Sequence, residues 1–441
     1  MESKHRSSPV TNLRIPNPAS DQARSPNLAT RISSSGGRTE GQPPAGGYLE
    51  AIRRYLTSGN RSVELDFVRG VAILLVIGFH ALAPPTRNPF FGGVEAAFKA
   101  MGWSGVDLFF VLSGFLVGGV LLSEYKKTGA LDVKRFIIRR GLKIWPAYYF
   151  YILFQALVRR HPIRSFLFAN LLHIQNYVGS SLEHTWTLSV EEHFYLLLSI
   201  SMGWMVLRGW PVRKMIVTFT VMLCLVLAVR CASWYGGLQV MAQHATHTRI
   251  DSLLLGVILT ALLQFYPRYF DWIAGRKGLL ISVCISAIAF IALAHGNLAV
   301  LYTIGYTLIY LGYAAFMLLL YRHSGTIRQF MAYQVIAKIG VYSYGIYLWH
   351  LAVRDTCFHV ANHFSPAVSW PVAIFLQYAT AIVLGAILTH LVEWPALRIR
   401  DRLFPAKDRL HALIVPSAVT PAAEPIASAA QPVSLSPEPS A

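Results

Sequence analysis

The amino-acid sequence predicts an all-α protein that crosses a membrane several times, with disordered tails at both ends. Of its 441 residues, 54% are hydrophobic and 14% are charged, whereas an ordinary soluble domain has about 25% charged residues. The apolar runs are helix-length, many of them about 20 residues, and they lack the short alternating pattern of barrel strands. Both observations predict transmembrane helices, and the repeated runs exclude a secreted protein with one cleaved leader.

The chain divides into three parts by composition. Residues 1–60 are rich in Ser, Arg, Pro, Gly and Asn without an apolar period, and we expect a disordered cytoplasmic tail. A mitochondrial transit peptide is the alternative, but three acidic residues among the first 40 depart from the acid-poor pattern of such peptides. Residues 61–403 form the membrane domain. Residues 404–441, rich in Pro, Ala and Ser, form a second disordered cytoplasmic tail.

The membrane domain is expected to contain ten helical spans. They are residues 66–84, 100–122, 143–158, 188–207, 214–231, 251–266, 278–295, 299–321, 335–354 and 369–393. An apolar piece at 165–177 is interpreted as half-buried or re-entrant. Because ten is an even number, both tails lie on one side, and the loops on that side carry most of the lysine and arginine. By the positive-inside rule, both termini are cytoplasmic.

The net charge of +18 raises the question of a nucleic-acid partner. The basic residues fall in short loops between apolar runs, where they set membrane topology, so we expect contact with membrane lipid and no nucleic acid. The four cysteines are Cys224, Cys231, Cys284 and Cys357, and no pair of them has the spacing of metal ligands. We therefore expect neither a metal site nor a disulfide scaffold.

Arg69 and His80 lie eleven positions apart in the first expected span. Eleven residues bring a helix back to within about 20° of its starting face and separate the two side chains by roughly 16 Å along the axis. Ionisable groups inside a membrane are expensive to bury and mark substrate or proton paths. The pair therefore predicts a substrate or proton path along this face of the helix. His80 alone would also suit an interfacial histidine at a helix end.

Further polar residues are expected at the outer ends of other spans. They are His184, Trp186, Ser189, Glu191 and Glu192 in the fourth span, Arg249 and Asp251 in the sixth, His350 in the ninth and Asp107 in the second. Singly, each is best interpreted as an interfacial residue or a structural ion pair, such as Arg249 with Asp251. Together, carboxylates beside histidines at one depth predict a general base, because a neighbouring carboxylate raises the proton affinity of imidazole and fixes its tautomer.

A basic cluster, Arg139, Arg140 and Lys143, leads into the third expected span from the cytoplasmic side. Such a cluster usually sets orientation or contacts anionic lipid. The sharper hypothesis is an anion cradle for a phosphorylated cytosolic donor, because charged donors bind phosphate oxygens strongly.

Seven sequence segments, taken in order, resemble the membrane acyltransferase-3 family of bacterial enzymes, and the resemblance covers residues 62–400. They are Arg69 with His80, Gly105 to Leu116, Arg139 to Pro146, Trp186 to Glu192, Arg249 to Asp251, Tyr342 to His350 and Glu393 to Pro395. Two positions depart from the family pattern: Lys143 stands where a second arginine is usual, and His193 where glutamine is usual. A lysine offers a point charge where an arginine would offer a bidentate contact.

The resemblance implies a multi-pass protein of the bacterial inner (cytoplasmic) membrane. Its donor substrate would be cytoplasmic acyl-CoA, acetyl-CoA above all, its acceptor a hydroxyl of an extracytoplasmic or lipid-linked glycan, and no metal is implied. The implied catalytic residues are His80, Glu191, Glu192, Arg69, Asp107 and His350; the donor would bind Arg139, Arg140, Lys143 and Arg69, and the acceptor Trp186, Arg249, Asp251 and His184. His80 would serve as general base or as transient acyl carrier, with Glu191 or Glu192 orienting its ring.

A proton-coupled exporter of a glycan or lipid is the competing interpretation. Ten spans with charges inside the membrane also describe a transporter. No inverted repeat is visible in the sequence, and the charges gather toward the outer ends of the spans. We therefore favour acyl transfer.

Overall fold

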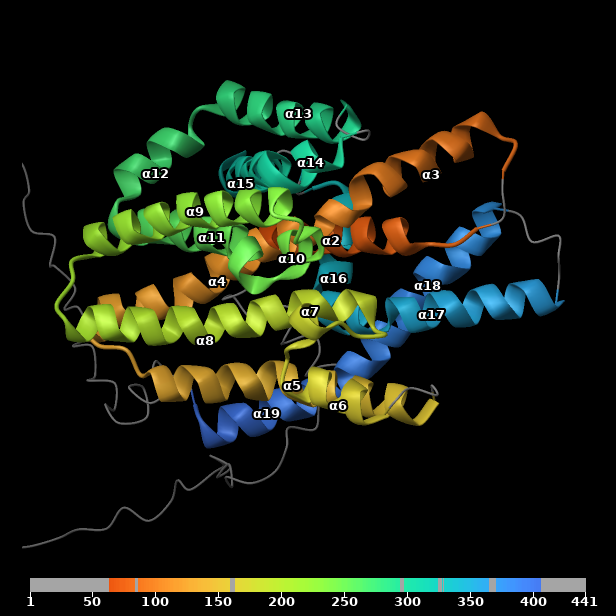
Figure 1. Cartoon of the computed structure of the whole chain (residues 1–441), viewed down its shortest axis with the longest axis horizontal. Helices are drawn as coiled ribbons and strands as arrows, with labels where there is room; N and C mark the ends of the chain where they lie inside the picture. The colour runs from red at the N-terminus through yellow and green to blue at the C-terminus, as the bar shows by residue number, and fades with distance from the viewer. Residues whose placement is uncertain are drawn as a thin grey trace, which may run out of the picture. The chain divides into compact units, whose positions relative to one another are not determined.

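The computed structural model describes residues 63–83, 86–158, 163–293, 297–323, 327, 329–364 and 370–405, and every regular element in these ranges is helical (Figure 1). The helices are α2 (Val63–His80), α3 (Pro89–Met101), α4 (Gly105–Thr128), α5 (Val133–Val158), α6 (Ile163–Leu171), α7 (Gln175–Val178), α8 (Trp186–Leu207), α9 (Val212–Tyr235), α10 (Gln239–His244), α11 (Thr246–Phe265), α12 (Pro267–Ala274), α13 (Lys277–Leu293), α14 (Leu298–Val300), α15 (Tyr306–His323), α16 (Met331–Val341), α17 (Ser343–Phe364), α18 (Trp370–Leu388) and α19 (Trp394–Leu403). The expected tails, 1–60 and all but the first two residues of 404–441, lie outside the described residues.

The expected all-helical, multi-pass membrane class is confirmed. Within the described ranges, five helical segments are long and apolar enough to cross a membrane, and six if the bent pair α12 and α13 counts as one span. The other four of the ten expected spans fall on α2, α5, α8 and the pair α16 and α17. These helices are less apolar or shorter because they carry many of the polar side chains of the cavities described below.

Helix α4 packs along α11 at the centre of the fold (Figure 1). Gly114 and Gly118 on α4 have the spacing that is typical of close helix pairs. A Cβ atom at Gly114 would lie 1.9 Å from the carbonyl oxygen of Leu253, and one at Gly256 would lie 2.2 Å from that of Val111. Only glycine allows the two backbones to approach so closely.

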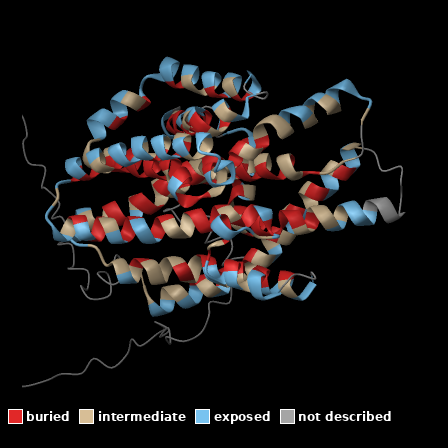
Figure 2. Ribbon diagram, in the orientation of Figure 1, coloured by how far each residue is buried: buried red, intermediate tan, exposed pale blue. Residues whose placement is uncertain are grey.

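Helix α2 is also largely enclosed. Figure 2 shows buried residues concentrated along α2, α4 and α11, whereas no residue of α3 is buried. Helix α3 was not expected from the apolar runs, although its start is marked by the Asn88 side chain, which accepts hydrogen bonds from the backbone N–H groups of Phe90 and Phe91. Pro89 at the first helical position agrees with this start.

The expected span at 335–354 is two helices, α16 and α17, which meet at Tyr342. Helix α16 packs against α2, where a Cβ atom at Gly340 would lie 1.8 Å from the carbonyl oxygen of Asp66. Helix α17 packs against α18 and also contacts α2. This break therefore lets α17 bring His350 beside the end of α2 that carries His80.

Candidate active site

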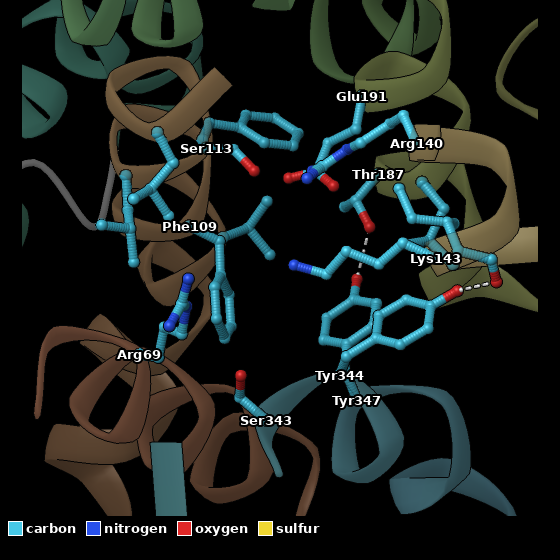
Figure 3. A pocket seen from close by; sticks show the side chains of 16 residues that line it. Arg69, Phe109, Ser113, Arg140, Lys143, Thr187, Glu191, Ser343, Tyr344 and Tyr347 are labelled. Atoms are coloured by element: carbon cyan, nitrogen blue, oxygen red, sulfur yellow. Dashed lines mark hydrogen bonds between the residues drawn. The ribbon is translucent and has the colours of Figure 1, made fainter. Parts of the chain in front are cut away.

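A cavity of about 800 Å³ lies among α2, α4, α5, α8 and α17. We call it the basic cavity, and its polar lining residues are Arg69, Ser113, Arg140, Lys143, Thr187, Glu191, Ser343, Tyr344 and Tyr347. Figure 3 shows Lys143 extending its amine into the middle of the space, while Arg140 and Glu191 point toward one another. Arg69, Arg140 and Lys143 line this partly enclosed space with one carboxylate, Glu191, while Arg69 also pairs with Asp66 at 2.6 Å; a lining with more cations than carboxylates favours an anionic ligand.

Arg140 is held in place by an aromatic ring. Its guanidinium carbon lies 4.2 Å from the centroid of Tyr195, and the Tyr195 hydroxyl lies 2.7 Å from the Ser113 Oγ atom, within hydrogen-bond distance. Stacking of this kind restricts the guanidinium group and leaves its edges available for hydrogen bonds.

A second cavity, of about 1750 Å³, is lined by His80, which shares a face of α2 with Arg69. We call it the histidine cavity, and its lining includes His80, His184, His244, Trp103, Trp186, Arg249, Tyr302 and Tyr306, together with the amides of Gln175, Asn176 and Gln243. A concave site lined by aromatic rings and a few polar groups is the usual form of a site for an organic ligand.

The two cavities adjoin each other. Val106 on α4 and Tyr347 on α17 line both of them. Arg69 lines the basic cavity and His80 lines the histidine cavity, so the two residues that share a face of α2 open into different chambers. The two cavities therefore share part of their lining at Val106 and Tyr347.

His80 and His184 line the histidine cavity, and the buried His350, which does not line it, packs against both rings. The ring centroid of His350 lies 5.0 Å from that of His80 and 5.2 Å from that of His184. The Nδ1 atom of His80 lies 2.9 Å from the carbonyl oxygen of Val76, and a neutral ring donates Nδ1–H to such a carbonyl. This tautomer keeps the lone pair of His80 on Nε2, which is the nitrogen that a general base or nucleophile uses.

His350 is held in the same way. Its Nδ1 atom lies 2.6 Å from the carbonyl oxygen of Tyr347. Its Nε2 atom is buried and has no hydrogen-bond partner among the described residues. In the described part of the chain, no three His, Cys, Asp or Glu side chains are arranged to hold a metal ion.

Residues 62–391 match the family model for an acyltransferase domain. The chain belongs to the acyltransferase-3 family. It is 25% identical to a peptidoglycan O-acetyltransferase OatA of Listeria monocytogenes over 373 residues, which cover 78% of this chain and 56% of the relative. It is 26% identical to a putative O-acetyltransferase of Staphylococcus aureus over 359 residues, 75% of this chain and 56% of the relative. An O-acetyltransferase OatA of the same species is 25% identical over 317 residues, 66% and 50% of the two chains.

The chain spans about half the length of the curated relatives it matches. No solved structure matches it. The expected acyltransferase-3 membership and the expected class of enzyme, a membrane acyltransferase with O-acetyltransferase relatives, are confirmed. The donor, the acceptor and the roles of single residues belong to the proposal below.

Five residues that the family resemblance assigned to the site line neither cavity: Arg139, Glu192, Asp107, Asp251 and His350. Arg139 pairs with Asp401 on α19 at 3.2 Å and donates to the carbonyl of Phe404, because it is one position, about 100° around the helix, from Arg140. Glu192 accepts a hydrogen bond of 3.0 Å from the Trp145 Nε1–H. These contacts do not support a role for Arg139 in donor binding, and that assignment stays a prediction.

The carboxylates of α8 do not orient His80. Glu191 lines the basic cavity beside Arg140, and Glu192 lies near Trp145. The ring of His80 is fixed instead by the carbonyl of Val76 and by contact with His350. The structure does not gather both carboxylates with the outer histidines, because α8 runs from Trp186, which lines the histidine cavity, to Glu191, which lines the basic cavity.

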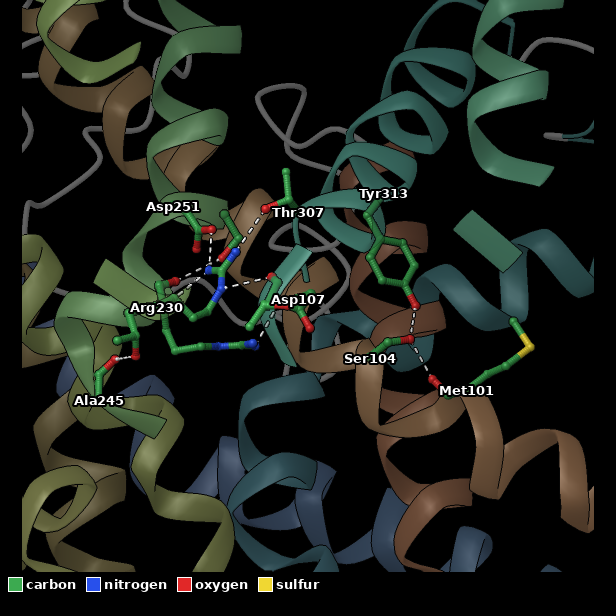
Figure 4. A network of polar contacts seen from close by, with 12 residues as sticks. Met101, Ser104, Asp107, Arg230, Ala245, Asp251, Thr307 and Tyr313 are labelled. Carbon is green, nitrogen blue, oxygen red and sulfur yellow. Dashed lines mark hydrogen bonds and ion pairs between the residues drawn. The ribbon is translucent and has the colours of Figure 1, made fainter. Parts of the chain in front are cut away.

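The charged residues of α11 form buried ion pairs with neighbouring helices. Arg249 pairs with Asp107 on α4 at 2.8 Å, and Asp251 pairs with Arg230 on α9 at 2.5 Å. All four side chains are at most 3% exposed, and Figure 4 shows Asp251 and Thr307 on either side of Arg230. The suggested pair of Arg249 with Asp251 is therefore wrong, and neither Asp107 nor Asp251 lines the two cavities.

Arg230 was missed from the sequence. It is fully buried, and besides Asp251 it donates to the carbonyls of Thr248 and Thr303 and to the Thr307 hydroxyl. A lone arginine inside an apolar span is a signal that was available, because such a charge needs a buried partner. Arg249, by contrast, lines the histidine cavity and lies 3.5 Å from the ring centroid of Tyr306.

Proposed function

We propose that this protein is an integral-membrane O-acyltransferase of the bacterial inner membrane. It moves an acyl group, acetyl above all, from cytoplasmic acyl-CoA to a hydroxyl of an extracytoplasmic or lipid-linked glycan. The observation that carries the proposal is the pair of adjoining cavities, one basic and one lined by His80, His184 and His244, which share Val106 and Tyr347 in their linings. Both termini are cytoplasmic in this proposal, so the basic cavity faces the cytoplasm.

The basic cavity suits the phosphorylated end of the donor. Arg140 and Lys143 lie one turn apart on α5, and Arg69 joins them from α2. Charge-assisted hydrogen bonds from such groups to phosphate oxygens are about twice as strong as neutral ones. The pantetheine arm then extends toward His80 along α2, over a span of roughly 16 Å.

The histidine cavity suits the acceptor. Trp186 offers an aromatic ring to a sugar, while Arg249 and His184 offer polar contacts. The name of the Listeria relative gives peptidoglycan as its substrate, and we extend the class of acceptor, a glycan hydroxyl, to this chain. His350 positions the base through ring contact with His80.

The transfer balances with the groups at hand. The hydroxyl oxygen of the acceptor bonds to the acyl carbon, the carbon–sulfur bond breaks, and the proton passes from the hydroxyl through His80 Nε2 to the thiolate of coenzyme A. In the other version, Nε2 first takes the acyl group and releases coenzyme A, and the hydroxyl then displaces the ring. Both versions use the same nitrogen.

Membranes from a deletion strain that carries each variant provide the test, because they retain the native acceptor. With acetyl-CoA, we expect His80→Ala to lower O-acetylation of the glycan by roughly 10²- to 10⁴-fold. His359→Ala, an exposed histidine on α17, is the matched control and should keep wild-type activity. Unchanged acetylation in folded His80→Ala would remove His80 from the mechanism.

The same assay separates transfer from export. A transferase releases free thiol from acetyl-CoA in step with the O-acetyl groups that appear on the glycan. A proton-coupled exporter releases none. Membership of the acyltransferase-3 family favours the first outcome.

A further inference from the structure

The two cavities meet at a small number of shared side chains. Among the residues that line cavities in the described part of the chain, Val106 and Tyr347 are the two that line both. Val106 is half-buried on α4, and Tyr347 is 7% exposed on α17. These two side chains therefore lie at the boundary between the two cavities.

Tyr347 is fixed in this position. Its hydroxyl donates a hydrogen bond of 2.8 Å to the carbonyl of His184, and the Thr187 Oγ1 atom on α8 lies 2.6 Å from the same hydroxyl. The ring meets that of Phe109 edge to face, with the centroids 6.1 Å apart. Figure 3 shows the Thr187 contact at the edge of the basic cavity. These contacts restrict the rotation of the Tyr347 ring.

The backbone of Tyr347 is part of the same arrangement. Its carbonyl oxygen lies 2.6 Å from the Nδ1 atom of His350, whose ring touches that of His80. The residue at this boundary thus also holds the histidine beside the base. A displacement of Tyr347 would therefore move His350 and His80 as well as the boundary between the two cavities.

We propose that Val106 and Tyr347 form the constriction that selects the acyl group of the donor. This inference rests on the proposed function, in which the thioester reaches His80 from the basic cavity. The acyl group is the leading end of the thioester arm, so it is the part that meets the constriction. The class of donor admitted is a short, unbranched acyl thioester such as acetyl-CoA, and longer or branched acyl groups are excluded by width.

The expected size of the effect follows from the physics of small apolar pockets. One extra methylene in such a pocket changes the relative rate by roughly 10- to 200-fold. Val106→Ala removes two methyl groups from the wall and makes room for a longer chain. Val106→Phe adds bulk at the same position and should lower transfer of all acyl groups.

The test uses membranes of the deletion strain with each variant, supplied with acetyl-CoA, propionyl-CoA or butyryl-CoA. The readout is the alkali-labile O-acyl group on the glycan, identified by mass spectrometry. Val111→Ala is the matched control, because Val111 lies on α4, is fully buried and lines neither cavity. We expect Val106→Ala to raise the propionyl-to-acetyl ratio at least about 10-fold and Val111→Ala to leave that ratio unchanged.

A propionyl-to-acetyl ratio that is the same in wild type, Val106→Ala and Val111→Ala overturns the selection role while the transferase function stands. Tyr347→Phe gives a second measurement, since it loses both hydroxyl contacts and loosens the ring; it should shift the ratio in the same direction. If the wild-type chain transfers none of the three acyl groups, the proposed function itself fails.

Discussion

Arg69 and His80 share one face of α2 and open into different cavities, the first into the basic cavity and the second into the histidine cavity. The Arg69 guanidinium forms an ion pair of 2.6 Å with Asp66 one turn below, and the His80 ring is tied to Val76 one turn below it. Both side chains are thus held by contacts within α2. A single helix therefore connects the cavity suited to an anion with the cavity that contains the base.

The pair Arg249 and Asp107 provides a prediction about stability. Asp107→Asn should lower the free energy of unfolding by about 3–5 kcal/mol, because it leaves the Arg249 charge buried without its counter-charge. Replacing both residues, as Asp107→Leu with Arg249→Met, should recover most of this loss, because no charge then remains unpaired. The measurement is the thermal unfolding midpoint in detergent.

Arg354 and Asp355 are the matched control for this pair. They lie 2.6 Å apart but are 25% and 30% exposed, so Arg354→Ala should cost less than about 1 kcal/mol. An equal loss for Asp107→Asn and Arg354→Ala would show that burial of the first pair does not govern its contribution.

The sequence was sufficient for those parts of the site that depend on one helix. The Arg69 and His80 relationship follows from helix geometry alone, and so does the placement of Arg140 and Lys143 on one face of α5. Partners between helices could not be predicted in this way. Arg249 pairs with a residue 142 positions away in the chain, and no local pattern distinguishes that partner from the carboxylate two residues away.

The sequence also could not predict which residues of one helix lie beside which residues of another. Glu191 and Glu192 follow His184 closely in the chain, and that proximity predicts the same depth in the membrane for all three side chains. The structure separates them, because α8 runs from the histidine cavity at Trp186 to the basic cavity at Glu191. Which carboxylate meets which basic group depends on how α8 packs against α4 and α5, and that packing is a tertiary property.

Close packing of α4 on α11 leads to a prediction for Gly114. Gly114→Ala should lower the free energy of unfolding by about 1–3 kcal/mol, because the new Cβ would lie 1.9 Å from the Leu253 carbonyl oxygen and the backbones must separate. Gly278→Ala on α13 is the control, since a Cβ there meets nothing within 4 Å, and it should gain up to about 1 kcal/mol. Thermal unfolding of both variants measures the difference, and equal midpoints would contradict the close contact.

Two neighbouring arginines on α5 should have opposite importance for the donor. Arg140 lines the basic cavity, whereas Arg139 pairs with Asp401 outside it. Loss of charged hydrogen bonds to phosphate costs about 1.5–3 kcal/mol, so Arg140→Ala should weaken binding of acetyl-CoA roughly 10- to 100-fold. Arg139→Ala should leave the affinity unchanged and cost at most about 1 kcal/mol of stability, because its ion pair is partly exposed.

Equilibrium binding of acetyl-CoA to the purified chain measures this contrast without need of an acceptor. Lys143→Ala should resemble Arg140→Ala, since its amine points into the same space (Figure 3). Arg140→Lys, which keeps the charge but loses the planar fork, should recover part of the affinity. Equal weakening by Arg139→Ala and Arg140→Ala would mean that the donor binds to the basic surface of α5 rather than inside the cavity, and the path from that cavity to His80 would then lose its support.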